Sequence, residues 1–157
     1  MTTLGRVLVV DDDRDIVESV RIRLSAAGYE ILVAFDGPQG VAMAISCEPD
    51  AIVLDVRLPK MDGMTALAKL KRHRITQNTP IVMLSASMFD QQAALLAGAS
   101  FFVLKPYLPK FLLAALEAAI QNGMAAASSS PRAGHISSIA PVASNDSRPV
   151  TPTVDRS

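Results

Sequence analysis

The sequence predicts an α/β fold in which one parallel sheet of five strands carries helices on both faces. Two observations support this prediction. Short apolar runs alternate five times with longer segments whose apolar residues recur with helical period. The short runs are apolar on both faces, as strands buried in a parallel sheet must be. Repeated strand–helix units imply right-handed crossovers and three layers, helix over sheet over helix.

The first half of the chain contains two of these units. Residues 6–10 (RVLVV) are expected to form the first strand, and residues 14–27 a helix with a buried apolar stripe that ends at Gly28. The second strand is expected at residues 30–34 (EILVA). A short Ala-rich helix over residues 37–47 follows it and stops before a proline.

Three further units complete the expected fold. Strands are predicted at residues 51–54, 80–84 and 101–104, and helices at residues 62–73, 90–97 and 109–121. Met64, Leu67 and Leu70 give the first of these helices its period, and Gly98 stops the second. The connections are short, as compact α/β domains prefer.

Composition limits the classes of function. The 157 residues include 15 basic and 15 acidic side chains, so charge gives no reason to expect nucleic acid or an anionic membrane as a partner. Cys47 is the only cysteine and is expected to be a small buried residue. No signal-peptide pattern or bilayer-length apolar run is present, which predicts a cytoplasmic protein.

The last part of the chain differs in composition from the rest. From residue 128 to residue 157, Ser, Thr and Pro supply 14 of 30 residues, and Glu and Lys are absent. Such a segment buries too little apolar surface to offset its ordering entropy. We therefore predict a folded domain at residues 1–123 and a disordered tail at residues 124–157, either an inert extension or part of a linker.

Four of the five predicted strands lead into residues that can act on a phosphate. The first leads into three aspartates, residues 11–13, the third into Asp55, the fourth into Ser85 and the fifth into Lys105. Ligands of open parallel sheets bind beyond the carboxyl ends of the strands, so the fold would gather these side chains. Taken singly, each has an ordinary explanation. An aspartate commonly caps a helix, as Asp13 is placed to do, a serine commonly lies in a turn, and a lysine is usually solvated.

Converging carboxylates predict a bound cation. Two of them about 4 Å apart repel by about 4 kcal/mol at an effective dielectric constant near 20. Lys105 supplies one positive charge against three carboxylates, whereas Mg²⁺ is commonly held by one or two carboxylates and water. Asp55 stands alone at its strand end and is expected to act as a nucleophile that forms an aspartyl phosphate.

Four segments, VLVVDDDRDI, IVLDVRLPKMDG, IVMLSAS and FFVLKPY, closely resemble the receiver domains of two-component response regulators. The resemblance covers residues 6–122, with every motif in order. It implies a doubly wound, flavodoxin-like sheet of order 2-1-3-4-5. It also implies a phosphorylation-dependent signalling switch rather than an enzyme.

The resemblance also implies roles for the acidic residues. Asp55 matches the phosphoacceptor, and Asp11 and Asp12 match the acidic pair that holds Mg²⁺. Asp12 would bind the ion directly and Asp11 through water, with the backbone carbonyl of Arg57 as a further ligand. Asp13 then lies outside the metal site.

Three further residues match parts of the family's switch. Ser85 matches the hydroxyl that responds to the phosphoryl group, Lys105 the lysine of the site, and Phe102 the aromatic side chain that moves inward. The switch is expected to change the face formed by the fourth helix, fifth strand and fifth helix. The Lys105–Pro106 bond is typically cis in this family, although X–Pro bonds in general favour trans.

The expected partners are a sensor histidine kinase or histidine phosphotransfer protein and a downstream protein target. No direct contact with nucleic acid or membrane is expected, and a phosphorylation-dependent homodimer stays open. One alternative is a receiver-like interaction module without phosphotransfer. Another is an Asp-nucleophile Mg²⁺ phosphatase, whose signature fits Asp11 and Asp13 but finds Asp15 where Thr or Val is needed.

Overall fold

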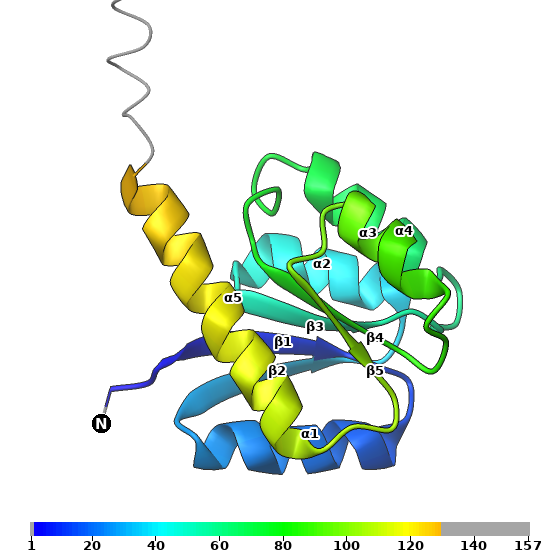
Figure 1. Cartoon of the computed structure of the whole chain (residues 1–157), viewed down its shortest axis with the longest axis horizontal. Coiled ribbons are helices and arrows are strands. Elements are labelled where there is room, and N and C mark those ends of the chain that lie inside the picture. The colour runs from blue at the N-terminus through cyan, green and yellow to red at the C-terminus, as the bar shows by residue number, and fades with distance from the viewer. Residues whose placement is uncertain (1, 130–157) are drawn as a thin grey trace, which may run out of the picture. The chain divides into compact units, whose positions relative to one another are not determined.

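A computed structural model describes residues 2–129, and its topology confirms the predicted fold class (Figure 1). Five parallel strands form one sheet in the order β2-β1-β3-β4-β5. The strands are β1 (Gly5–Val10), β2 (Tyr29–Ala34), β3 (Ala51–Asp55), β4 (Ile81–Ser85) and β5 (Phe101–Leu104). The helices are α1 (Arg14–Ala26), α2 (Gly37–Cys47), α3 (Gly63–Arg72), α4 (Asp90–Leu96) and α5 (Pro109–Ser129).

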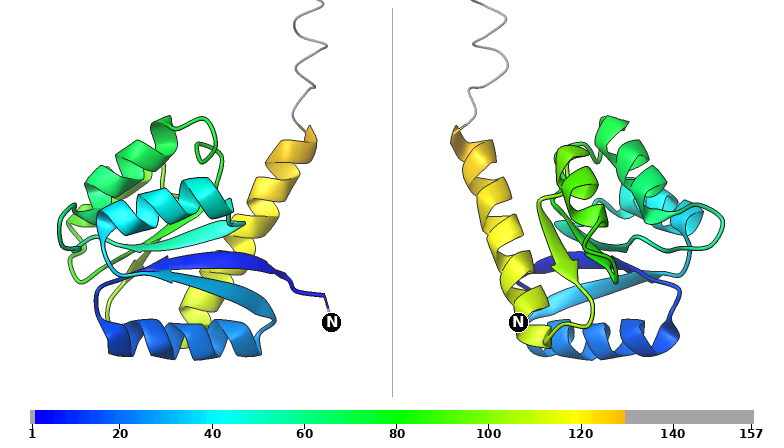
Figure 2. Two further views of the ribbon diagram at one scale, coloured as in Figure 1. Left: turned by 180° about the vertical axis from the view of Figure 1, so that it is seen from behind. Right: turned by 45° about the vertical axis from the view of Figure 1, so that its right-hand side comes forward.

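The sheet is covered by helices on both faces, as Figure 2 shows from two sides. On one face, buried side chains of α2, α3 and α4 pack against the strands in one apolar cluster. On the other face, buried side chains of α1 and α5 pack in a second cluster. The chain divides into Met1–Met124 and Ala125–Ser157, and the sheet with both clusters lies in the first unit.

The central strands feed both clusters by simple alternation. In β1, Leu8 and Val10 join the cluster under α2, α3 and α4, whereas Val7 and Val9 join the cluster under α1 and α5. All four side chains are at most 1% exposed. Successive side chains point to opposite faces of a strand, so a run that is apolar throughout is required where both faces are covered.

A polar cap begins α1, and glycines end α1 and α4, close to the predicted positions. The Asp13 side chain caps α1 by accepting hydrogen bonds from the backbone N–H groups of Asp15 and Ile16, as predicted. Gly28 follows α1 with φ of 109° and Gly98 follows α4 with φ of 111°. Both angles favour glycine over residues with a Cβ, which explains where these helices stop.

Strands β3 and β4 each end one residue later than predicted. β3 includes Asp55 and β4 includes Ser85, because the ladder continues through the pairs Asp55–Leu84 and Ser85–Leu104. Side-chain polarity marks these positions as strand ends in the sequence, but pairing depends on the backbone alone. The backbone of both residues is therefore fixed by sheet pairing rather than by a loop.

The last helix also extends further than predicted. Residues 109–121 are expected to be helical, whereas α5 continues to Ser129. The segment after Gln121 includes three consecutive alanines, the residue with the highest helix propensity, and a single glycine costs only about 1 kcal/mol. The predicted tail lies outside the described residues from position 130 onward. Among residues 2–129, no helix has both the length and the apolar character that a membrane crossing requires.

Helix α3 begins at Gly63 in close contact with the backbone of Asp55 and Val56. A Cβ at this position would lie 2.0 Å from the Asp55 carbonyl oxygen, and the Gly63 N–H donates to the Val56 carbonyl at 2.6 Å. We expect Gly63→Ala to lower the free energy of unfolding by roughly 2–3 kcal/mol, because backbone must shift to admit the methyl group. Urea unfolding followed by circular dichroism measures this change.

Gly123→Ala provides the matched control. A Cβ at Gly123 would lie 3.7 Å from the Pro80 side chain, an ordinary contact, within helix α5. We expect this variant to be as stable as the wild type or more stable by up to about 1 kcal/mol. Equal stability of Gly63→Ala and the wild type would contradict the close approach of α3 to β3.

Candidate functional site

The sheet brings the predicted polar residues together at the carboxyl edge of its strands. Asp11 directly follows β1, Asp55 ends β3, Ser85 ends β4 and Lys105 directly follows β5. Asp11 and Lys105 are 94 positions apart in the sequence, yet their side chains are in contact. The parallel arrangement therefore assembles one site from four strand ends, as the sequence predicts.

Lys105 connects the two most buried carboxylates. Its Nζ lies 3.1 Å from Oδ1 of Asp55 and 3.4 Å from Oδ2 of Asp11. Asp11 and Asp55 are only 1% and 5% exposed. The other oxygen of Asp11 accepts a hydrogen bond from the Asp13 backbone N–H at 3.0 Å, which fixes the orientation of this carboxylate.

Three carboxylates meet at this edge. Asp11, Asp12 and Asp55 each offer an oxygen, and these oxygens lie within 4.8 Å of one another. Asp12 is the exposed member of the group, whereas Asp13 uses its side chain to cap α1. One lysine opposes three carboxylates, so ionised side chains leave an excess of two negative charges.

The pKa of Asp55 reflects this imbalance. Burial raises it above its ordinary value and the neighbouring charge of Asp11 raises it further, while Lys105 and the backbone N–H of Arg57 offset only part of the rise. For Lys105, burial lowers the pKa, but the charges and hydrogen bonds of Asp55 and Asp11 outweigh burial, so the pKa is raised. The lysine therefore stays charged, and the ionised form of Asp55 is disfavoured.

These residues fit a hard divalent cation. Carboxylate oxygens are the side-chain ligands that Mg²⁺ takes in proteins, and a divalent charge would balance the excess negative charge. The predicted role of the Arg57 backbone carbonyl as a ligand stays a prediction, as do the individual roles of Asp11 and Asp12.

Ser85 is held by the connection that leads to α4. Its side chain is 1% exposed, and its hydroxyl donates to Oδ2 of Asp90 at 2.6 Å while accepting from the Ser87 N–H at 3.0 Å. The sequence places Asp90 at the start of a predicted helix and does not predict this contact. An acidic residue five positions after a candidate hydroxyl is the signal that was available.

Phe102 and Pro106 flank the lysine in sequence. Phe102 is partly buried and packs against the cluster under α2, α3 and α4, where its strand partner is Met83. The Lys105–Pro106 bond is cis, as the resemblance implies. The inward movement of Phe102 stays a prediction.

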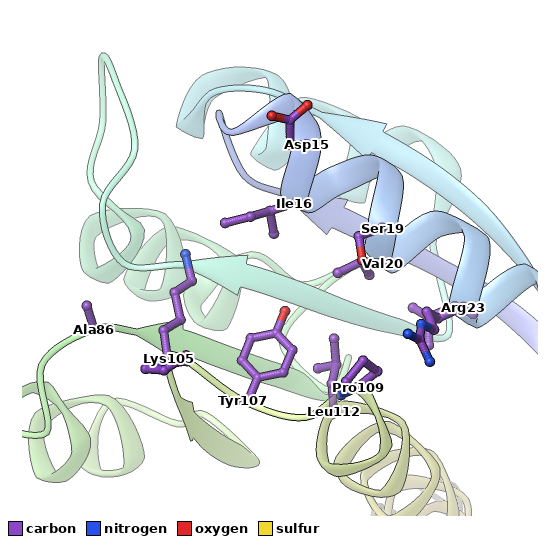
Figure 3. A pocket seen from close by; sticks show the side chains of 12 residues that line it. Asp15, Ile16, Ser19, Val20, Arg23, Ala86, Lys105, Tyr107, Pro109 and Leu112 are labelled. Carbon is purple, nitrogen blue, oxygen red and sulfur yellow. The ribbon is translucent and has the colours of Figure 1, made fainter.

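An apolar groove of about 570 Å³ opens beside Lys105. Figure 3 shows Lys105 and Tyr107 on the side of the β5–α5 connection, facing Ile16 and Ser19 of α1. Burial is the main cause of a raised pKa at Tyr107. The groove adjoins the acidic cluster through Lys105, which lines the groove and contacts Asp11 and Asp55.

The two histidines and the cysteine lie away from this edge or outside the described residues. His73 ends α3, and its Nδ1 accepts a hydrogen bond from the Ile75 N–H, which explains it structurally. Cys47 is half-buried at the end of α2 rather than fully buried as expected. His135 lies outside the described residues.

Comparison with known proteins agrees with this arrangement. A model of the response regulator receiver domain family matches residues 7–117. The DNA-binding dual master transcriptional regulator RpaA of Synechocystis is 37% identical over 121 residues, which are 76% of this chain and 50% of RpaA. The transcriptional regulatory protein PrrA of Mycobacterium leprae is 38% identical over 127 residues, 80% of this chain and 54% of PrrA. The chain thus spans about half the length of these curated relatives.

Solved structures share the fold as well. The chemotaxis response regulator CheY4 of Vibrio cholerae superposes with a TM-score of 0.70 at 31% identity, covering 76% of this chain and 99% of CheY4. The receiver domain of the Francisella response regulator 1452 gives a TM-score of 0.71 at 29% identity, covering 75% of this chain and 98% of that domain. The likeness therefore extends over almost the whole of these two structures.

The raised pKa of Asp55 predicts a pH-dependent gain in stability when its charge is removed. Because the pKa is higher in the folded than in the unfolded protein, ionised Asp55 opposes folding above the folded-state pKa. This penalty disappears as the pH falls below the ordinary carboxyl value of about 3.9. In the presence of chelator, we expect Asp55→Asn to raise the free energy of unfolding near pH 7 by about 1 kcal/mol.

Urea unfolding at several pH values measures this gain in the free energy of unfolding, which should vanish at about pH 3. Asp12→Asn is the control, since its carboxylate is exposed and should give a smaller gain. An Asp55→Asn variant that is less stable than the wild type near neutral pH would contradict the electrostatic description of the site.

Proposed function

This chain belongs to the family of response regulator receiver domains, and on that premise we propose that Asp55 accepts a phosphoryl group and thereby switches the protein between signalling states. Membership of this family gives the class of function, a phosphorylation-dependent signalling switch. The acceptor, the metal ligands and the partners are the finer parts of the proposal.

One observation supports the choice of acceptor above all others. Asp55 is buried among the carboxylates of Asp11 and Asp12 and is in contact with the Lys105 ammonium group. It is also the member of the cluster that ends the central strand β3. The ionised form of Asp55 is disfavoured, so a bound cation that neutralises its charge, or a covalent bond that removes it, stabilises the site.

Asp11, Asp12 and Asp55, with the backbone carbonyl of Arg57, would hold Mg²⁺. When bound, the ion supplies positive charge that stabilises the negative oxygens of the group being transferred. Lys105 contributes the same kind of stabilisation from the chain itself, because its Nζ already lies 3.1 Å from an Asp55 oxygen. The chain regulates through its own phosphorylation and turns over no separate substrate.

In the proposed transfer, a carboxylate oxygen of Asp55 attacks the phosphorus atom of a phosphohistidine on the donor. The new O–P bond forms as the P–N bond breaks, and the electron pair of the broken bond stays on the imidazole nitrogen. The product is an acyl phosphate on Asp55 and a free histidine on the donor. Positioning by buried, fixed side chains supplies most of the catalysis in reactions of this kind.

The proposed donor is a sensor histidine kinase or a histidine phosphotransfer protein. The apolar groove between α1 and the β5–α5 connection supports a protein donor, because an approaching protein surface can pack there beside Lys105. No direct contact with nucleic acid or membrane is proposed. The name of RpaA includes DNA binding, but this chain matches only about half of that protein's length.

The proposed output is a change in the face of α4, β5 and α5, with Ser85 and Phe102 as the switch residues. The elements of this face and the connection before α4 carry large apolar side chains that are exposed, among them Phe89 at 90%, Leu96 at 80% and Phe111 at 55% exposure. Such a face suits a downstream protein target. Two phosphorylated copies would pair through the same apolar contacts.

Labelling with a small phosphodonor tests the proposal. Incubation with acetyl phosphate and Mg²⁺ should add one phosphoryl group to the wild type, measured as intact mass. Asp55→Asn should remove the adduct, since an amide oxygen does not replace the carboxylate as a nucleophile. Asp50→Asn is the matched control and should label like the wild type, because Asp50 directly precedes β3 and therefore lies at the opposite edge of the sheet.

Two results would favour the alternatives. A wild type that never labels points to an interaction module without phosphotransfer. Steady release of phosphate from unrelated phosphomonoesters points to an Asp-nucleophile phosphatase. Full labelling of Asp55→Asn would show that another residue is the acceptor.

Metal binding is tested by stability. At a concentration about 100-fold above its dissociation constant, Mg²⁺ should raise the free energy of unfolding by about 2.7 kcal/mol, because it binds only the folded protein. Asp12→Asn should weaken this response. Asp13→Asn is the control, since an asparagine also caps α1 and position 13 lies outside the cluster. An equal response of both variants would contradict the ligand assignment.

A further inference from the structure

The hydrogen bonds of Ser85 restrict what its hydroxyl can do. The side chain is buried, donates to Oδ2 of Asp90 at 2.6 Å and accepts from the Ser87 N–H at 3.0 Å. A serine hydroxyl has one proton and therefore serves one acceptor at a time. Hydrogen bonds to ionised carboxylates are stronger than bonds between neutral groups. Asp90 therefore holds the only proton that Ser85 can donate.

Asp90 has no cationic partner among the described residues. None of the ion pairs within residues 2–129 includes it, and its carboxylate is half-buried at the first position of α4. The Ser85 hydroxyl is thus the side-chain donor that this carboxylate uses. Separation of the two groups leaves a partly desolvated carboxylate without that donor, which is unfavourable.

The backbone of Ser85 is fixed, so a change in its partner requires rotation of the side chain. Ser85 pairs with Leu104 in the sheet, and its carbonyl accepts from the Lys105 N–H at 2.7 Å. It stands one position beyond Leu84, the strand partner of Asp55. The proposed function requires this hydroxyl to serve a phosphoryl oxygen on Asp55, and the proton is then lost to Asp90.

We propose that Asp90 is a positioning residue that holds the Ser85 hydroxyl away from Asp55, so that a phosphoryl group and the Asp90 carboxylate compete for one proton. This inference rests on the proposed function and concerns the regulation of the same site. Competition of this kind opposes the phosphorylated arrangement. Its strength depends on the one hydrogen bond between Ser85 and Asp90.

The same hydrogen bond links the site to the surface. Asp90 begins α4, and the preceding connection carries Met88 and Phe89, which are 64% and 90% exposed. When Ser85 turns toward Asp55, the start of α4 loses the hydrogen bond between Asp90 and Ser85 of β4. A local change in charge at Asp55 would therefore act on the apolar face through Asp90, the kind of coupling that a two-state switch needs.

Beryllofluoride, which mimics a phosphoryl group on an aspartate, is the probe for this competition. Its dissociation constant is measured by isothermal titration calorimetry at saturating Mg²⁺, for the wild type and for Asp90→Ala. Loss of a charged hydrogen bond from the competing state should tighten beryllofluoride binding by about tenfold. Asp90→Asn keeps the shape of the side chain with a weaker acceptor and should tighten binding less. Gln91→Ala, at the next position of α4, should bind as the wild type does.

A Ser85→Ala background separates the proposed role from general electrostatics. Removal of any nearby negative charge favours an anion, but only the proposed competition depends on the Ser85 hydroxyl. The gain from Asp90→Ala should therefore disappear when position 85 carries alanine. A gain that persists in that background, or equal affinities of wild type and both Asp90 variants, would overturn the inference while leaving the proposed function intact. Absence of beryllofluoride binding by the wild type would overturn the proposed function, and this inference with it.

Discussion

The ammonium group of Lys105, placed between the buried carboxylates of Asp11 and Asp55, is the interaction on which the account of this protein depends. It offsets part of the repulsion that follows from burying two acids at one sheet edge. The compensation is incomplete, because Asp12 adds a third carboxylate and the pKa of Asp55 remains raised. Added positive charge or covalent modification of Asp55 would therefore relieve the remaining repulsion at the site. Both belong to the proposed chemistry.

The fold provides this arrangement through ordinary packing. Apolar side chains on both faces of β1, β3 and β4 require helices above and below the sheet, and the parallel order then brings all strand ends to one edge. Gly63 lets α3 begin directly against the backbone of Asp55. Stability and function are thus coupled here, since a buried carboxylate that opposes folding is also the reactive group.

The sequence predicts the sheet, the edge and the four strand-end residues, because strand hydrophobicity and parallel topology determine them. The end of α5 is harder to predict, since the change in composition toward the tail and the helix propensity of its alanines point to different boundaries. Asp90 is missed because its contact depends on how the connection from Ser87 to Phe89 returns to Ser85. The exposure of Phe89 and Leu96 has a different cause, because the short helix α4 buries only Ala94.

A crystal structure with Mg²⁺ and beryllofluoride would test the central claim most directly. The account predicts the metal ion in contact with the carboxylates of the cluster, beryllofluoride on Asp55 with Lys105 beside it, and the Ser85 hydroxyl turned from Asp90 toward a fluorine atom. Metal bound at another group of acids, or beryllofluoride on a residue other than Asp55, would contradict it.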